Sequence, residues 1–303
     1  MLLGNHRAAW RFSVRSGRDA GPAGPSARGL AAAVHDRIAG DDFAAAHAKI
    51  WHTPGPLWFT EADPVWRVHA DTSMFVGGIR ALLLQSLHPV AMLAVSQHSG
   101  FRGDPWGRLH RTSRFLASTT YGTIADAERD IAIVRAIHGR VSGTTQEGLP
   151  YRASDPELLA WVHLAEADSF LSAHQHFGAR PLSAAEADTY VEQAGLVAGL
   201  LGVLSPPCSV AELHDVLAAY RPGLRMTDQA QEACDLLLRD PPLRGPARAG
   251  YAALAAGAIS TLPSWARSML GLPTQPVADR LVARPLARSG LATIRWALAG
   301  QAA

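Results

Sequence analysis

The sequence predicts an all-α protein that folds as a compact multi-helix single domain. Apolar residues recur at spacings of three and four along most of the chain, which is the period of a helix with one face in a core. Capping-box patterns and prolines divide these stretches into segments of about 10 to 20 residues. The sequence contains no convincing strict alternation and no Asn-Gly turn, so no sheet is predicted.

The composition excludes several classes of function. The chain has 303 residues, of which 48% are hydrophobic, and a net charge of +2, so it can bury a large core. Its basic residues are almost all arginine and are scattered among Asp and Glu, so nucleic-acid binding is not expected. Cys208 and Cys234 form no CxxC or zinc pattern, and a reduced, cytoplasmic protein is expected, with a single disulfide as the alternative.

The N-terminus and the most apolar stretch bear on membranes. Residues 1–28 are expected to be a disordered basic tail, with the folded domain over 29–303, because no apolar run of a secretory signal is present. The longest apolar run, Met74–Val95, is interrupted by Arg80 and Pro89. A bilayer span needs about 20 apolar residues with few charges. We therefore expect a buried helix or helix pair without a transmembrane segment, and peripheral membrane contact is the alternative.

The N-terminal half is divided by prolines and glycines. A first helix is expected over residues 29–50, and a proline-broken aromatic connection over 51–64. His88 precedes Pro89, and because the residue before a proline is biased away from helix, a kink or helix end is expected there. A short linker is predicted over 144–151.

Three capping-box patterns open helices in the C-terminal half. They are Ser154–Glu157, Ser183–Glu186 and Ser209–Glu212. Further prolines, from Pro206 to Pro276, separate the remaining helices.

Two helices joined near Tyr121-Gly122-Thr123 form the stretch on which the functional interpretation depends. The second begins with a capping pattern at Thr123, and His138 lies on its apolar stripe, where packing alone would favour Leu. Arg135 lies three residues before His138, on the adjoining face. In the first helix Arg108 and Thr112 are four residues apart and share a face. We infer that this helix pair holds the active site.

The usual catalytic motifs are absent. There is no GxGxxG, Walker, GxSxG or HExxH pattern, and Glu-x-x-His, the spacing of di-iron carboxylate bundles, does not occur. No acidic residue lies between Asp71 and Asp104, although His88 and His98 do. A stretch with few acidic residues and one or two histidines suits a large, apolar cofactor that is bound through histidine, such as haem.

An ordered set of motifs resembles the DUF2236 family, the oxygenase domain shared by rubber oxygenases (latex clearing proteins) and the fungal MpaB oxygenase. The resemblance covers about residues 60–270. It is carried by Phe75-x-Gly-Gly-x-Arg-Ala-Leu-Leu-Leu-Gln85, Leu87-His-Pro89, His98-Ser99, Gly107-Arg-Leu-x-Arg-Thr112, Tyr121-Gly122, Val134-Arg-x-x-His138, Tyr151-Arg-Ala153, Trp161-Val-His163 and Pro181-Leu-Ser183.

The resemblance implies a mostly helical fold that holds one haem b. It implies that His138 is the proximal iron ligand and that Arg108 and Thr112 lie beside the haem, where they would shape the oxygen site. Arg135 matches the other arginine of the motif. His163 is expected to pack in the core, or else to line the pocket or serve as a second ligand.

The chain departs from the rubber oxygenases at two positions. Arg111 stands where they have a lysine, and a guanidinium does not deprotonate at ordinary pH, so it should not bind iron. The helix upstream of Arg108 also lacks the glutamate that they carry as a proposed base.

Cleavage of polyisoprene is therefore not expected. The resemblance implies a haem-dependent oxygenase that acts with O₂ on another hydrophobic small molecule. A non-catalytic haem or hydrophobic-ligand binding protein is the alternative. Thr112 could instead bond to its own helix, and Arg108 could form a surface ion pair with Asp104.

Overall fold

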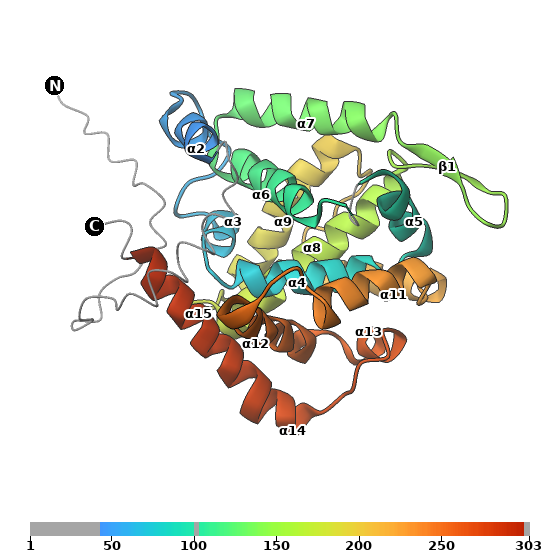
Figure 1. The fold of residues 1–303 in the computed structure, drawn as a ribbon. Helices are drawn as coiled ribbons and strands as arrows, with labels where there is room; N and C mark the ends of the chain where they lie inside the picture. Colours follow the sequence, from blue (N-terminus) through green and yellow to red (C-terminus); the bar gives the residue numbers. More distant parts are fainter. Residues whose placement is uncertain (1–42, 100–102, 300–303) are drawn as a thin grey trace.

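The computed structural model describes residues 43–99 and 103–299, and it confirms the all-α prediction. In these ranges one small two-stranded hairpin accompanies the helices (Figure 1). The predicted tail, residues 1–28, lies outside the described residues, and so does the 29–42 part of the first predicted helix.

The N-terminal half follows the prolines and glycines of the sequence. Its helices are α2 (Phe43–His52), α3 (Pro64–His69), α4 (Met74–Gln85), α5 (Pro89–His98), α6 (Pro105–Tyr121) and α7 (Ile124–His138). The antiparallel strands β1 (Ser142–Thr144) and β2 (Pro150–Arg152) follow. They lie at the two ends of the segment 144–151 that is predicted as a linker, and strands of three residues are too short to show alternation.

The C-terminal half contains the longest helix and two π-helical turns. Its elements are α8 (Pro156–Phe177), α9 (Ala184–Leu201), α10 (Val210–Tyr220), the 3₁₀ turn η1 (Arg221–Gly223), α11 (Asp228–Cys234), the π turn η2 (Asp235–Arg239), α12 (Gly245–Thr261), α13 (Ser264–Met269), α14 (Pro276–Ala278), the π turn η3 (Asp279–Ala283) and α15 (Arg284–Ala299).

The helix starts test the capping predictions. The Ser183 and Ser209 side chains each accept a hydrogen bond from the backbone N–H three residues later, as predicted. The predicted box at Ser154 is wrong, because Asp155 is the N-cap residue of α8 and its side chain forms no capping hydrogen bond. The Asp155 carboxylate instead accepts a hydrogen bond from the Arg152 N–H before the helix, at 2.9 Å.

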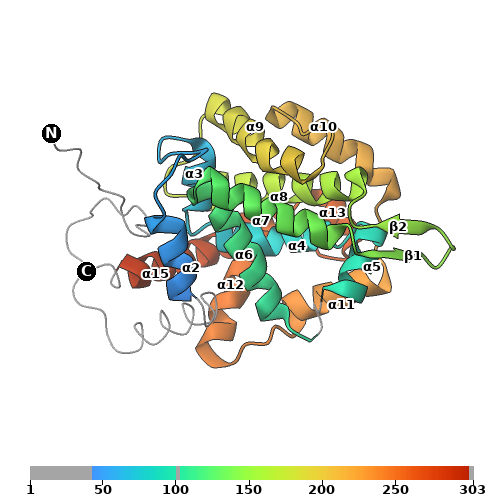
Figure 2. The ribbon, with the colours of Figure 1, turned by 90° about the horizontal axis from the view of Figure 1, so that it is seen from above.

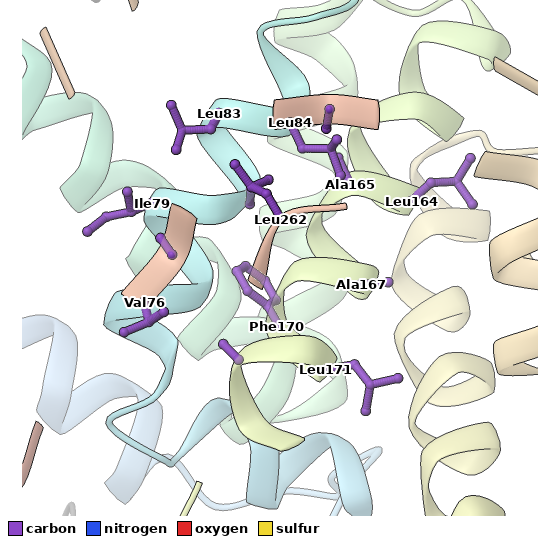
Figure 3. Close-up of a cluster of buried hydrophobic side chains, with 14 of the residues drawn as sticks. Val76, Ile79, Leu83, Leu84, Leu164, Ala165, Ala167, Phe170, Leu171 and Leu262 are labelled. Carbon is purple, nitrogen blue, oxygen red and sulfur yellow. The ribbon is translucent and has the colours of Figure 1, made fainter. Parts of the chain in front are cut away.

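The core is built around α4 and α8, which lie against each other (Figure 3). Leu83 and Leu84 of α4 and Leu164 of α8 are fully buried, and each such side chain stabilises the fold by roughly 1.5–3 kcal/mol. Gly77 allows the close approach, since a Cβ there would lie 3.0 Å from Phe170 Cδ1. The Met74–Val95 run is therefore core, as expected from the sequence.

A buried ion pair also joins these two helices. Arg80 of α4 contacts Asp168 of α8 at 2.7 Å and donates a hydrogen bond to Ser169 Oγ, also at 2.7 Å. It also donates to the Thr261 carbonyl at the end of α12, at 3.2 Å. Arg80 thus links three helices from inside the core.

The chain bends sharply at His88, as predicted from Pro89. The His88 ring caps α5, because its Nδ1 accepts a hydrogen bond from the Ala91 N–H at 3.3 Å, and α4 and α5 meet at a bend of 108°. Within residues 43–99 and 103–299, no single helix is long and apolar enough to cross a bilayer. Only the bent pair α4–α5 reaches that length and composition together.

Candidate functional site

The predicted helix pair is α6 and α7, which run apart from the turn at Gly122 (Figure 2). Thr123 caps α7 by accepting a hydrogen bond from the Asp126 N–H at 3.2 Å, as predicted. Arg108 and His138 each lie about four helical turns from Gly122. Both therefore lie toward the ends of the two helices that are remote from the turn.

His138 ends α7 in a partly buried position. The Ala127 and Ile131 side chains earlier on the same stripe are fully buried, whereas His138 is half-buried. Its Nδ1 is buried and has no hydrogen-bond partner among the described residues. Burial lowers the pKa of the ring, so the imidazole is neutral at pH 7. A neutral imidazole is the form that binds a metal ion.

Arg108 is partly buried and hydrogen-bonded to the chain. Its guanidinium donates a hydrogen bond to Ser99 Oγ at 2.8 Å. Burial lowers its pKa, and the nearby Glu166 opposes that effect. The structure contains no ion pair between Arg108 and Asp104, which was the alternative. Asp104 instead caps α6 through the Gly107 N–H at 2.7 Å, and the exposed Arg111 approaches it at 3.6 Å.

Thr112 and Arg135 lie away from the Arg108 guanidinium. Thr112 is exposed, and its hydroxyl donates to the Arg108 carbonyl of its own helix at 3.1 Å. Arg135 is exposed as well, and it donates to the Leu200 carbonyl of α9 at 3.1 Å. Thr112 therefore bonds to its own helix, which is the alternative stated for it above. Arg135 connects α7 to α9.

Glu166 of α8 is a titratable residue that the sequence analysis did not single out. Its side chain is partly buried, and Gln85 of α4 donates a hydrogen bond to Oε1 at 3.2 Å. Burial raises the pKa of Glu166 to about 7, against the opposing effects of Gln85 and Arg108.

His163 lies three residues before Glu166 and shares its face of α8. Its Nε2 is buried without a partner among the described residues, and burial lowers the pKa of the ring to about 4. A second neutral imidazole therefore lies in the interior.

The two residues form a His-x-x-Glu pattern in the sequence. This is the reverse of the Glu-x-x-His spacing that di-iron carboxylate bundles require. Nothing in the sequence indicated that Arg108, on a distant helix, would lie near Glu166. The contact between α4 and α8 that places Gln85 beside Glu166 is a tertiary feature as well.

The arrangement could hold a cofactor through single imidazoles but offers no cluster for a bare ion. Within the described part of the chain, no group of three or more His, Cys, Asp or Glu side chains could hold a metal ion. The available donors are separate neutral histidines, a partly buried guanidinium and a partly buried carboxyl group. A neutral imidazole can serve as an axial ligand of haem iron, and a guanidinium can pair with an anionic group.

Residues 66–296 match the family model for the ER-bound oxygenase mpaB/B' and rubber oxygenase catalytic domain. This range includes α4 to α13 and every site residue described above. No curated protein and no solved structure matches the chain.

Proposed function

The chain belongs to the family of mpaB and rubber oxygenase catalytic domains, and on that premise we propose that it is a haem b-dependent oxygenase acting on a hydrophobic small molecule with O₂. Membership in this family supports an oxygenase in general. The haem, the identity of its ligand and the class of substrate are the parts that we propose.

The observation that carries the proposal is the His138 imidazole. It is neutral because burial lowers its pKa, and its Nδ1 is buried without a partner in the described part of the chain. A ring in this state fits the requirement for an axial haem ligand. His138 is also the histidine to which the family resemblance assigns that role.

Arg108 fits the charge of a haem. A haem b carries two propionate groups, and the partly buried Arg108 guanidinium has five N–H donors, of which one is bonded to Ser99 Oγ among the described residues. Arg108 would orient that anion. Thr112 would have to exchange its hydrogen bond to the Arg108 carbonyl for a bond to an oxygen atom at the site.

The bound haem iron would supply the electron-transfer and O₂ chemistry of the reaction. The chain's own contribution is to hold the group at His138, to place a positive charge at Arg108 and to exclude water with the apolar core around α4 and α8. A hydrophobic substrate suits this environment, because the core formed around α4 and α8 is apolar.

One observation favours the alternative, a haem protein without turnover. Thr112 is exposed, and its hydroxyl proton is donated to the Arg108 carbonyl of its own helix. That proton is therefore not directed at a bound oxygen molecule. Consumption of O₂ in the presence of a reductant separates the two functions.

The test is to supply the chain with haem during expression and to measure its absorbance and O₂ uptake. The proposal predicts a Soret band and O₂ consumption that increases with a hydrophobic substrate. A Soret band without O₂ consumption would favour the binding protein, and a colourless protein would exclude both functions.

A further inference from the structure

The exposed side of α14, η3 and α15 carries four large apolar side chains, which we call the apolar strip. They are Val277, Leu281, Val282 and Leu286, with exposed fractions of 69, 68, 55 and 51%. They form two pairs with a spacing of four residues, which is the spacing of neighbours on one helix face. Single apolar residues on a surface are ordinary, but a group of neighbours indicates an interaction site.

The other side of the same segment belongs to the fold. Ala287 and Leu291 are fully buried, and α15 packs against α12 and α8. α14 and α15 run along an outer edge of the molecule (Figure 1). The segment is therefore amphipathic, with one side in the core and the apolar strip facing away from it.

The C-terminal part of the chain is strongly basic. Residues 241–303 contain seven arginines and one acidic residue, Asp279, so their net charge is +6 in a chain whose total is +2. Residues 1–240 accordingly have a net charge of −4. Such a charge asymmetry between two parts of a chain indicates interaction with an anionic surface.

Three arginines beside the apolar strip carry uncompensated charge. Asp279 is paired with the buried Arg267, so it does not neutralise them. Arg280, Arg284 and Arg288 form no ion pair among the described residues. Arg284 and Arg288 each donate one hydrogen bond to a backbone carbonyl, at 3.2 Å. A guanidinium has five N–H donors, so most of theirs stay available for an anionic partner.

The combination of charge and aliphatic side chains selects the occupant. In a symmetric contact between two copies of the chain, the three arginines of one copy would meet those of the other, and like charges repel. Single-stranded nucleic acid would require aromatic side chains for stacking, and the apolar strip has none. An anionic bilayer fits both features, because its interface accepts aliphatic side chains and its headgroups attract arginine.

The other apolar parts of the molecule suit a bilayer less well. The Met74–Val95 run, the most apolar of the sequence, is part of the core. Ile133 and Ile137 of α7 are exposed, but that helix has three acidic and two basic residues. Only α14, η3 and α15 combine an exposed apolar face with an excess of arginine among the described elements.

We propose that the apolar strip and the three arginines beside it form a docking surface for an anionic lipid bilayer. The segment lies in the plane of the membrane interface, with the apolar strip below the headgroups. The stems of Arg280, Arg284 and Arg288 follow the apolar strip, and their guanidinium groups pair with lipid phosphates and carboxylates. The inference depends neither on haem nor on the proposed reaction.

Flotation of the full chain with lipid vesicles is the first test. We expect binding to vesicles of phosphatidylcholine and phosphatidylserine in a three-to-one ratio, and much weaker binding to phosphatidylcholine alone. Raising the salt concentration should weaken the binding, because it screens the attraction between arginine and headgroup. Absence of binding to both kinds of vesicle, or equal binding to both, would overturn the proposal.

Two variants separate the apolar and the charged contributions. Leu281→Ser and Arg280→Glu should each weaken binding to the anionic vesicles roughly tenfold or more, because one removes an inserted leucine and the other reverses a charge. Leu204→Ser and Arg152→Glu are the matched controls, since both side chains are exposed outside the segment, and both variants should bind like the parent. Equal losses in variants and controls would contradict the assigned surface.

Hydrogen exchange of the full chain locates the contact. Anionic vesicles should slow amide exchange in residues 276–289, and protection confined to other segments would overturn the proposal. The mass of the chain in solution, measured without vesicles, tests the other occupant. A dimer that becomes a monomer in Leu281→Ser would assign the apolar strip to a second copy and would also overturn it.

Discussion

At the scale of single residues, Arg111 is a departure from the pattern of the rubber oxygenases. It replaces the lysine of rubber oxygenases, and the structure places its side chain on the surface, 3.6 Å from Asp104. Its side chain is exposed and does not reach the interior. We therefore assign Arg111 no direct contact in the proposed site.

Replacement of Arg111 by alanine should accordingly have little effect. Exposed ion pairs contribute about 0–1 kcal/mol, so the free energy of unfolding in urea should fall by no more than about 1 kcal/mol. The absorbance spectrum of the haem-loaded protein should be the same as that of the parent. A changed spectrum in Arg111→Ala would place this side chain beside the haem and contradict the assignment.

The proposed site residues depend on different signals in the sequence. His138 was proposed because a polar ring interrupts an apolar stripe, and Arg108 because the family motif names it. The contact of Glu166 with Gln85 could not be predicted in this way, since it depends on the packing of α4 against α8. The roles of Thr112 and Arg135 stay predictions, and both side chains are exposed in the structure.

At the scale of the elements, local signals predicted helix starts better than short strands. The Thr123, Ser183 and Ser209 caps depend on neighbouring residues alone, so the sequence contains the information. The hairpin of β1 and β2 has only one buried residue per strand at most, and its pairing depends on contacts across the turn. The sequence pattern therefore could not distinguish it from a linker.

The contact between α12 and α15 can be tested with two glycines of the same helix. A Cβ on Gly257 would lie 2.5 Å from the Cβ of Ala287, so the two helices would have to move apart. Gly257→Ala should therefore lower the free energy of unfolding by about 1–3 kcal/mol, as measured by urea denaturation.

Gly250→Ala is the matched control within α12. Nothing lies within 4 Å of a Cβ added there, so the substitution only improves helix propensity and should stabilise the protein by up to about 1 kcal/mol. Equal effects of the two substitutions would show that the α12–α15 packing is not as tight as the structure has it.

At the scale of the whole molecule, the fold class was predictable because the helical period runs through the chain. The arrangement of the helices was not, since it depends on interior contacts such as Arg80 with Asp168. A buried arginine in an apolar stretch could be noticed in the sequence, but its partner 88 residues away could not. The ion pair joins α4 to α8, and Arg80 also reaches the end of α12.

Loss of Arg80 should destabilise the whole fold. Arg80→Met would leave the Asp168 carboxylate with only the His214 ring, at 3.5 Å, and loss of one partner costs about 3–5 kcal/mol in comparable buried ion pairs. The urea midpoint should fall strongly, with far-ultraviolet circular dichroism as the readout. Arg225→Ala, which removes an exposed pair with Glu147, should shift the midpoint far less, and similar shifts in the two variants would contradict the structural role of Arg80.

The most direct test of the account is the absorbance spectrum of four proteins expressed with added haem: the parent, His138→Ala, His163→Ala and His52→Ala. His52 is exposed at the end of α2 and serves as the control. We predict a Soret band in the parent and in His52→Ala, and its loss or displacement in His138→Ala. A band that His138→Ala leaves unchanged, or one that only His163→Ala removes, would contradict the assignment of His138 as the haem ligand.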